Sequence, residues 1–196
     1  MTIALAELFN ELEAFGKAND TVTTDRALRM LNITHDTGEF LELLVRALGA
    51  RRVLEVGTSN GYSTLWLAKA AQAIDGLVTT LEQSAYKIDL ATKNFARTSL
   101  APHIKLVHSE AGSFINQLAS EAFDLVFLDS ERTEYVGWWP GVRAIVRVGG
   151  LLVADNATSH AQEMQPFISM VKTDASFITS LVPVGNGEFL ALKVAS

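Results

Sequence analysis

The sequence predicts a doubly wound α/β fold: a mostly parallel β-sheet with helices on both faces and an antiparallel hairpin at one edge. From residue 51 onward, short continuous apolar runs alternate with segments of helical periodicity. This alternation is typical of parallel strands that are buried on both faces. Near the C-terminus, two strand-like runs flank a Gly-Asn-Gly turn, which predicts the hairpin.

Length and composition indicate one globular domain. The chain has 196 residues, of which 48% are hydrophobic and 19% are charged. We expect residues 1–48 to form an N-terminal helical cap and residues 51–196 to form the α/β core of a single domain spanning residues 1–196.

The charged residues and the missing cysteines exclude several function classes. The net charge is −6 and no Lys/Arg cluster is present, so we expect no nucleic-acid partner. The absence of cysteine excludes disulfides, thiolate zinc sites and a cysteine nucleophile. Acidic residues interrupt the apolar ones near the start, so we expect no signal peptide, no membrane span and a cytoplasmic protein.

The N-terminal elements are predicted to be helical. Apolar residues recur at helical spacing over residues 5–15, and Gly16 is the expected end of that helix. We expect a polar linker over residues 18–25, a short helix near Leu28 and a longer helix over residues 40–48.

The predicted strands of the core are continuous apolar runs, and the predicted helices lie between them. The strands are expected at 53–56, 77–82, 104–107, 123–129 and 151–155. The helices are expected at 62–73, 85–98, 111–118 and 140–148. A further helix at 162–172 precedes the two strands of the hairpin, at 177–184 and 189–194.

The strongest local signal is the segment from Val53 to Thr64, where a buried strand runs into a glycine turn and then a helix. Gly57 and Gly61 allow the backbone to approach a ligand closely. Their G-x-x-x-G spacing differs from the G-x-G-x-x-G pattern of dinucleotide-binding enzymes. Glu82 ends the next strand, where a carboxylate can accept hydrogen bonds from ribose hydroxyls. Together these features predict a nucleoside ligand.

Four motifs carry a resemblance to a known family. They read EVGTSNGYSTLWLA, TTLE, FDLVFLDSER and VGGLLVADNATSH. This pattern resembles class I S-adenosylmethionine-dependent O-methyltransferases related to the catechol and caffeoyl-CoA enzymes. The resemblance spans about residues 33–160 and implies a Rossmann-like, seven-stranded sheet that ends in an antiparallel hairpin.

The resemblance also implies which residues contact S-adenosylmethionine. Glu55, Gly57 and Ser63 are expected to line the amino-acid end of the cofactor, and Glu82 is expected to hold the ribose. The remaining cofactor positions implied are the pair Glu110 and Ala111, which flank the adenine, and Asp129.

A divalent metal is expected at the carboxyl ends of two predicted strands. Asp129 ends one of them, and Asp155 and Asn156 follow the other. Three oxygen donors at one sheet rim suit a hard cation such as Mg²⁺. In related metal-dependent enzymes the three positions are the Asp, Asp and Asn matched here. A cation bound to an acceptor oxygen would stabilise the oxyanion and fix its direction.

Three further features have open roles. The catalytic lysine of the family aligns with Arg132, which is too basic to accept a proton and is expected to be an electrostatic partner of the acceptor. His160 is a candidate second base or metal ligand, although a histidine there more often opens a helix. Trp138 and Trp139 are expected to wall the substrate pocket or a dimer interface, with core packing as the alternative for one of them.

The resemblance implies an enzyme that transfers a methyl group to a hydroxyl of a small aromatic, catechol-like molecule with help from a divalent metal. We expect a homodimer. The alternatives are a metal-independent methyltransferase and a methyltransferase-like fold that only binds a nucleoside, which the arginine at position 132 keeps open. A nicotinamide dehydrogenase is a third option, and the glycine spacing counts against it.

Overall fold

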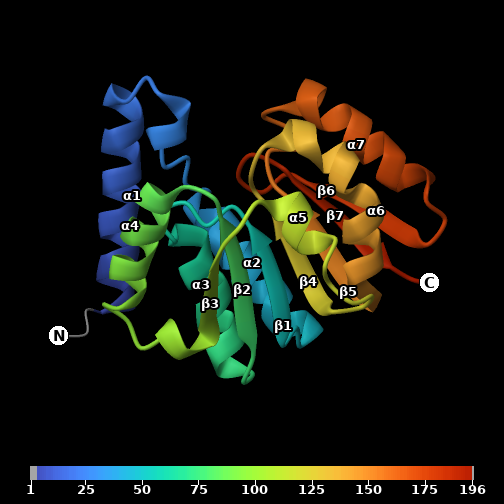
Figure 1. Ribbon diagram of the computed structural model, residues 1–196, viewed down its shortest axis with the longest axis horizontal. Helices are drawn as coiled ribbons and strands as arrows, with labels where there is room; N and C mark the ends of the chain where they lie inside the picture. The colour runs from blue at the N-terminus through green and yellow to red at the C-terminus, as the bar shows by residue number, and fades with distance from the viewer. Residues whose placement is uncertain (1–3, 196) are drawn as a thin grey trace.

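The computed structural model describes residues 4–195 and contains the predicted seven-stranded sheet, with helices on both faces (Figure 1). The strands follow the order β3-β2-β1-β4-β5-β7-β6 across the sheet. Their bounds are β1 (Arg52–Val56), β2 (Leu77–Glu82), β3 (Ile104–His108), β4 (Phe123–Leu128), β5 (Val146–Ala154), β6 (Phe177–Val182) and β7 (Glu188–Lys193).

Two types of pairing make up the sheet. The first five strands pair in parallel, with β1 between β2 and β4. Strand β7 runs antiparallel to both β5 and β6, so the C-terminal hairpin is inserted at the edge as the sequence predicts. The order of the strands reverses at β1, because β2 lies on one side of it and β4 lies on the other. Ligands bind at such a point in open α/β sheets.

Helices of two kinds connect the strands. The α-helices are α1 (Leu5–Val22), α2 (His35–Leu48), α3 (Tyr62–Ala73), α4 (Ala85–Phe95), α5 (Ala111–Ile115), α6 (Tyr135–Ile145) and α7 (Ala161–Thr173). Three short 3₁₀ helices are η1 (Arg26–Leu28), η2 (Ala101–His103) and η3 (Arg132–Glu134). Side chains of Thr34, Ser84 and Glu110 cap the starts of α2, α4 and α5.

The sheet separates two apolar layers. Alternate residues of each central strand point to opposite faces, so Leu125 and Phe127 pack with α1 to α4, while Val126 and Leu128 pack with α5 to α7. Burial on both faces explains why these strands read as continuous apolar runs.

The N-terminal helix differs from the prediction at its end. Helix α1 passes through Gly16 and ends at Val22, so much of the expected linker is helical. Gly16 has a packing role instead: a Cβ there would lie 2.6 Å from the side-chain nitrogen of Asn32. That amide nitrogen donates to the carbonyl of Leu12 at 3.0 Å, so the glycine makes room for a contact between helix and loop.

The boundary between α6 and β5 also differs from the prediction. Helix α6 begins at Tyr135, five residues before Pro140, because Tyr135 and Trp139 are buried on its inner face. Strand β5 begins at Val146, which pairs with Phe123 across an irregularity in the register. Gly149 and Gly150 fall between the predicted helix and the predicted strand, whereas the structure places both within β5. Among residues 4–195, no helix combines the length and hydrophobicity that spanning a bilayer requires.

Candidate active site

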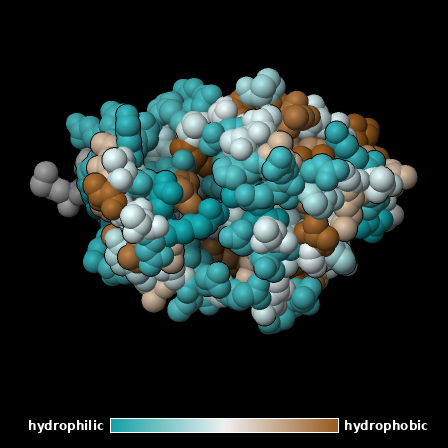
Figure 2. Space-filling view, turned by 90° about the horizontal axis from the view of Figure 1, so that it is seen from above, coloured by the Kyte–Doolittle hydropathy of each residue, from teal (hydrophilic) through white to brown (hydrophobic). Residues whose placement is uncertain are grey.

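A cavity of about 1360 Å³ lies at the carboxyl ends of the parallel strands. The residues that follow β1, β4 and β5 line it: Gly57, Asp129 and Asp155. Its opposite wall comes from α1 and the segment leading into α2. Seen from above, the surface is hollowed near its middle, with hydrophilic groups around the hollow (Figure 2). The volume exceeds that of a typical small-molecule pocket, so a nucleoside cofactor and an acceptor can both fit.

The glycine loop is built for close approach. Gly57 has φ +108°, and a Cβ there would lie 2.1 Å from the backbone oxygen of Asp129. Gly61 has φ +89°, and a Cβ there would lie 2.4 Å from the ring of Phe95. Both positions therefore require glycine, as the strand–loop–helix pattern predicts. Gly57 also lines the cavity, so a ligand can approach the backbone at this position.

Glu55 lies behind the cavity wall and is not among the residues that line it, so its expected contact with the cofactor stays a prediction. Its carboxylate is fully buried and accepts hydrogen bonds from Ser63 Oγ at 2.6 Å, from Thr80 Oγ1 at 2.6 Å and from Thr64. Burial raises its pKa to about 7, against the opposing effect of the three hydroxyl donors. Ser63 lines the cavity, so the hydrogen bond to Glu55 holds a side chain of the cavity wall in place.

The other expected cofactor residues line the cavity. Glu82 accepts from the backbone nitrogens of Ser59 and Ser84, each at 2.9 Å, and so ties the glycine loop to the end of β2. Glu110 caps α5 through two 2.6 Å bonds to backbone nitrogens, which hold its pKa below the ordinary value. Its carboxylate is thus occupied, while Ala111 presents only a small side chain.

Two orphaned polar atoms indicate a polar ligand. Asn60 Nδ2 and Ser130 Oγ are buried without a hydrogen-bond partner among the described residues, and both residues line the cavity. Leaving a buried polar group unpaired costs about 1–3 kcal/mol, so such groups are normally satisfied by a bound molecule or water. The glycine cradle and these atoms fit a nucleoside cofactor.

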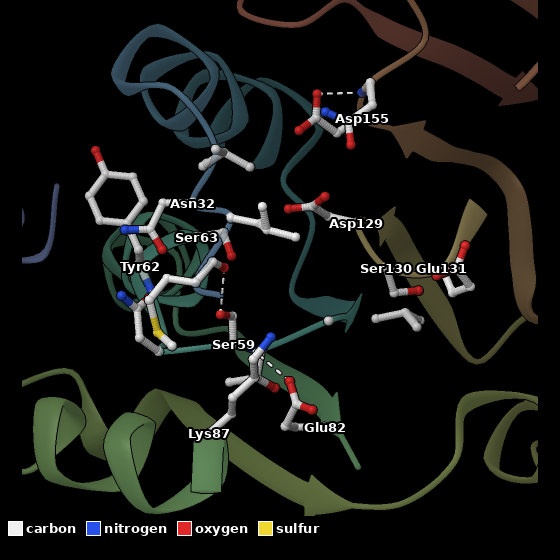
Figure 3. A pocket seen from close by; sticks show the side chains of 18 of the residues that line it. Asn32, Ser59, Tyr62, Ser63, Glu82, Lys87, Asp129, Ser130, Glu131 and Asp155 are labelled. Carbon is white, nitrogen blue, oxygen red and sulfur yellow. Dashed lines mark hydrogen bonds between the residues drawn. The ribbon is translucent and has the colours of Figure 1, made fainter. Parts of the chain in front are cut away.

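Two carboxylates face the cavity from the sheet rim. Asp129 and Asp155 point into it in Figure 3, opposite Tyr62 and Ser63. Burial, and then the charge of Asp155, raises the pKa of Asp129 well above its usual range. Burial likewise raises the pKa of Asp155.

A third carboxyl, Glu188, was missed by sequence reasoning. It is fully buried at the start of β7, where Oε1 accepts from Thr37 Oγ1 at 3.1 Å and Oε2 has no partner among residues 4–195. Burial and the nearby charge of Asp155 raise its pKa. Glu188 belongs to no motif that could be recognised in the sequence, and only the folding of β7 brings its side chain close to the rim.

Arg132 reaches the predicted metal ligands. Its side chain is only 6% exposed, and its Nη1 donates to Asn156 Oδ1 at 3.1 Å. Its Nε donates to Glu163 Oε2 at 2.8 Å. The structure therefore brings Asp129, Asp155 and Asn156 together at the rim as predicted, but the amide oxygen of Asn156 contacts a guanidinium. Glu163 was not anticipated, because its helix was predicted without a role.

Of the remaining candidate residues, two line the cavity and one lies in the core. Trp138 lines the cavity, whereas Trp139 packs between Phe167 and Phe177 in the core. His160 lines the cavity at the start of α7, and its Nδ1 lies 3.0 Å from Ser159 Oγ.

The wall opposite the rim belongs to the N-terminal elements. Ser59 Oγ donates to the carbonyl of Met30 at 2.7 Å, which links the glycine loop to this wall. The carboxylate of Asp20 accepts from the backbone nitrogens of Met30 and Leu31 at 2.7 and 2.8 Å. The Tyr62 hydroxyl donates to Glu13 on α1. Sequence periodicity identified these helices but gave no sign of these polar links.

Comparisons with known proteins agree with this geometry. The family model described as O-methyltransferase matches residues 9–194. Catechol O-methyltransferase from Mycobacterium tuberculosis is 36% identical over 129 residues, which cover 66% of this chain and 58% of that protein. Catechol O-methyltransferase from Niastella koreensis is 33% identical over 129 residues, covering 64% and 58%. The matched region thus spans 58% of the length of each of these relatives.

Solved structures agree as well. The crystal structure of cofactor-bound Rv0187 from MTB has a TM-score of 0.80 at 28% identity, covering 94% of this chain and 90% of that one. The O-methyltransferase from Bacillus cereus in complex with SAH shares the fold, with a TM-score of 0.79 at 23% identity, covering 97% and 92%. The chain belongs to the O-methyltransferase family, of the class I, catechol and caffeoyl-CoA type.

Proposed function

We propose that this protein transfers a methyl group from S-adenosylmethionine to a hydroxyl of a small aromatic, catechol-like acceptor. One observation carries the proposal: a single cavity joins a glycine loop with unpaired buried polar atoms to a rim of two acidic side chains. The first part suits a nucleoside cofactor, and the carboxylates of the second can accept a hydrogen bond from an acceptor hydroxyl.

The cofactor end of the proposal uses the glycine loop and the end of β2. When bound, S-adenosylmethionine supplies a methyl group on a positively charged sulfur. The backbone at Gly57 lets it approach, and Glu82 offers acceptor oxygens to ribose hydroxyls. Asn60 Nδ2 and Ser130 Oγ offer unpaired polar atoms.

The acceptor end uses the rim. A phenolic hydroxyl has a pKa near 10, by analogy with tyrosine, so it needs positive charge beside it to react as the oxyanion. Trp138 lines the same cavity, but it lies beside Gly112, next to the Glu110 and Ala111 pair that is expected to flank the adenine. An aromatic acceptor is therefore proposed from the similarity to catechol O-methyltransferases.

A divalent cation at Asp129, Asp155 and Asn156 is one candidate for that charge. The two carboxylates suit it, because each is an oxygen donor at the cavity surface. Asn156 does not fit as arranged, since Arg132 donates to its amide oxygen. Within residues 4–195, no three His, Cys, Asp or Glu side chains are placed to hold a metal together. Magnesium therefore stays a prediction.

The testing experiment separates binding, catalysis and metal use. Calorimetry with the demethylated cofactor product should show one site per chain, and mass spectrometry should detect methylated product from catechols. Vicinal diols should react faster than mono-hydroxy analogues if chelation contributes. Binding without product from any acceptor would favour the alternative of a nucleoside-binding protein, and no binding would contradict the proposal.

A further inference from the structure

A buried guanidinium lies among the oxygen groups at the acceptor end of the cavity. Arg132 donates to Asn156 at 3.1 Å and to Glu163 at 2.8 Å, and it lines the cavity. Positive charge at this end of the cavity is therefore provided by the chain itself.

Glu163 fixes the direction of that charge. It lies in the first turn of α7, and its carboxylate accepts from Nε of Arg132. Because the guanidinium is planar, bonds at Nε and Nη1 together define its orientation. Nη2 has no hydrogen bond to any residue between 4 and 195, so its two N–H groups are left for a ligand in the cavity.

The same arrangement opposes a divalent ion. Magnesium lies at about 2.0–2.1 Å from its oxygen ligands. An ion on Asn156 Oδ1 would therefore lie within roughly 5 Å of Arg132 Nη1, which is 3.1 Å from that oxygen. Two positive charges so close repel strongly in a site shielded from water. A lysine on its flexible stem could move away, whereas Arg132 is held by Glu163.

We infer that Arg132, oriented by Glu163, takes the place of a divalent cation and stabilises the acceptor oxyanion through its free N–H groups. The inference rests on the proposed methyl transfer. The acceptor hydroxyl gives its proton to solvent as it binds beside the guanidinium. An electron pair of the resulting oxyanion then forms the O–C bond while the C–S pair returns to sulfur, which leaves a neutral ether and a neutral thioether.

A binding experiment tests the competition without turnover. Mn²⁺ is titrated into protein saturated with the demethylated cofactor and followed by electron paramagnetic resonance. The wild type should bind no stoichiometric Mn²⁺ at millimolar concentration, while Arg132→Ala should bind one ion at least tenfold more tightly. The matched control is Arg143→Ala, which removes another arginine that pairs with a carboxylate, that of Asp174 at 2.6 Å, and should behave as wild type. Equal, tight binding by wild type and Arg132→Ala would overturn the inference.

A kinetic experiment tests the role of the guanidinium. In excess chelator, the wild type should keep its activity within twofold, and Arg132→Ala should lose at least a hundredfold in kcat. Millimolar guanidinium added to Arg132→Ala should restore part of that loss, which a purely structural role would not allow. Product-cofactor affinity and melting temperature report whether the variant is folded.

Glu163 is tested as a positioning residue. Glu163→Gln keeps the shape but weakens the bond to Arg132, so kcat should fall about tenfold while affinity for the demethylated cofactor stays unchanged. Glu163→Asp should recover part of the loss. A kcat of Glu163→Gln equal to that of wild type would overturn the role of Glu163.

The outcomes distinguish this inference from the proposed function. Loss of wild-type activity in chelator, with recovery on adding Mg²⁺, would overturn the inference and leave methyl transfer standing. Failure of the wild type to methylate any acceptor, with or without metal, would overturn the proposed function itself, while the Mn²⁺ titration would still decide the competition.

Discussion

Replacing Glu55 with glutamine removes a titrating group from the interior, and its effect on stability should depend on pH. The folded protein holds the pKa of Glu55 at about 7, compared with an ordinary value of 4.5. A carboxyl with a raised pKa favours folding most below its unfolded pKa, and this contribution is lost as pH rises through the folded pKa. A tenfold difference in proton affinity between the folded and unfolded chain corresponds to about 1.4 kcal/mol.

From these two values, the wild type should lose about 2–3 kcal/mol of unfolding free energy between pH 5 and pH 8 through Glu55 alone. Glu55→Gln lacks that loss. Urea unfolding of both proteins at the two pH values gives the result as a difference of differences, in which other titrating groups cancel. The unfolding free energy of the variant relative to that of wild type should therefore rise by about 2–3 kcal/mol toward alkaline pH.

The control is Glu7→Gln, which removes an exposed carboxylate on α1 and should change stability by the same small amount at both pH values. If the relative stability of Glu55→Gln were the same at pH 5 and pH 8, the burial argument for Glu55 would be refuted. A decrease toward alkaline pH would mean that the three hydroxyl donors outweigh burial and stabilise the ionised form.

Three further predictions concern the cavity and the core. Gly57→Ala should cost about 1–3 kcal/mol of unfolding free energy from backbone strain, plus the clash with the neighbouring strand end, and thermal melting measures it. Glu82→Ala should weaken binding of the demethylated cofactor by about 1–3 kcal/mol in calorimetry, because ribose hydroxyls lose their acceptor. Trp139→Ala should destabilise the protein by about 3–5 kcal/mol in urea unfolding, whereas Trp138→Ala should cost less, because Trp138 is only partly buried against the core.

Most of the sheet could be predicted from the sequence, because burial on both faces gives a strand a continuous apolar run. The run over residues 77–82 coincides with β2, and the helix over residues 62–73 coincides with α3. Prediction failed where tertiary packing overrides local preference. Gly16 lies within α1, where the missing side chain leaves room for Asn32, and no pattern near Gly16 reveals a partner that is 16 residues away.

The site was predicted less completely than the fold. Motif positions identified residues at the strand ends, since the carboxyl ends of neighbouring parallel strands must meet. They could not show that Glu55 is turned inward, because a strand residue next to a loop can face either layer. Nor could they reveal Glu163 and Glu188, which reach the rim only through the docking of α7 and the insertion of β7.

The wall that α1 and the following loop build across the cavity has a consequence for how specificity can change. Residues 13–35 contribute one side of the cavity as a single contiguous stretch of chain, joined to the core through Ser59 and Tyr62. Substitutions there can reshape the room for an acceptor without disturbing any strand. A chimera that exchanges residues 13–35 between family members should therefore change which acceptor is preferred while the sheet and the cofactor loop stay the same.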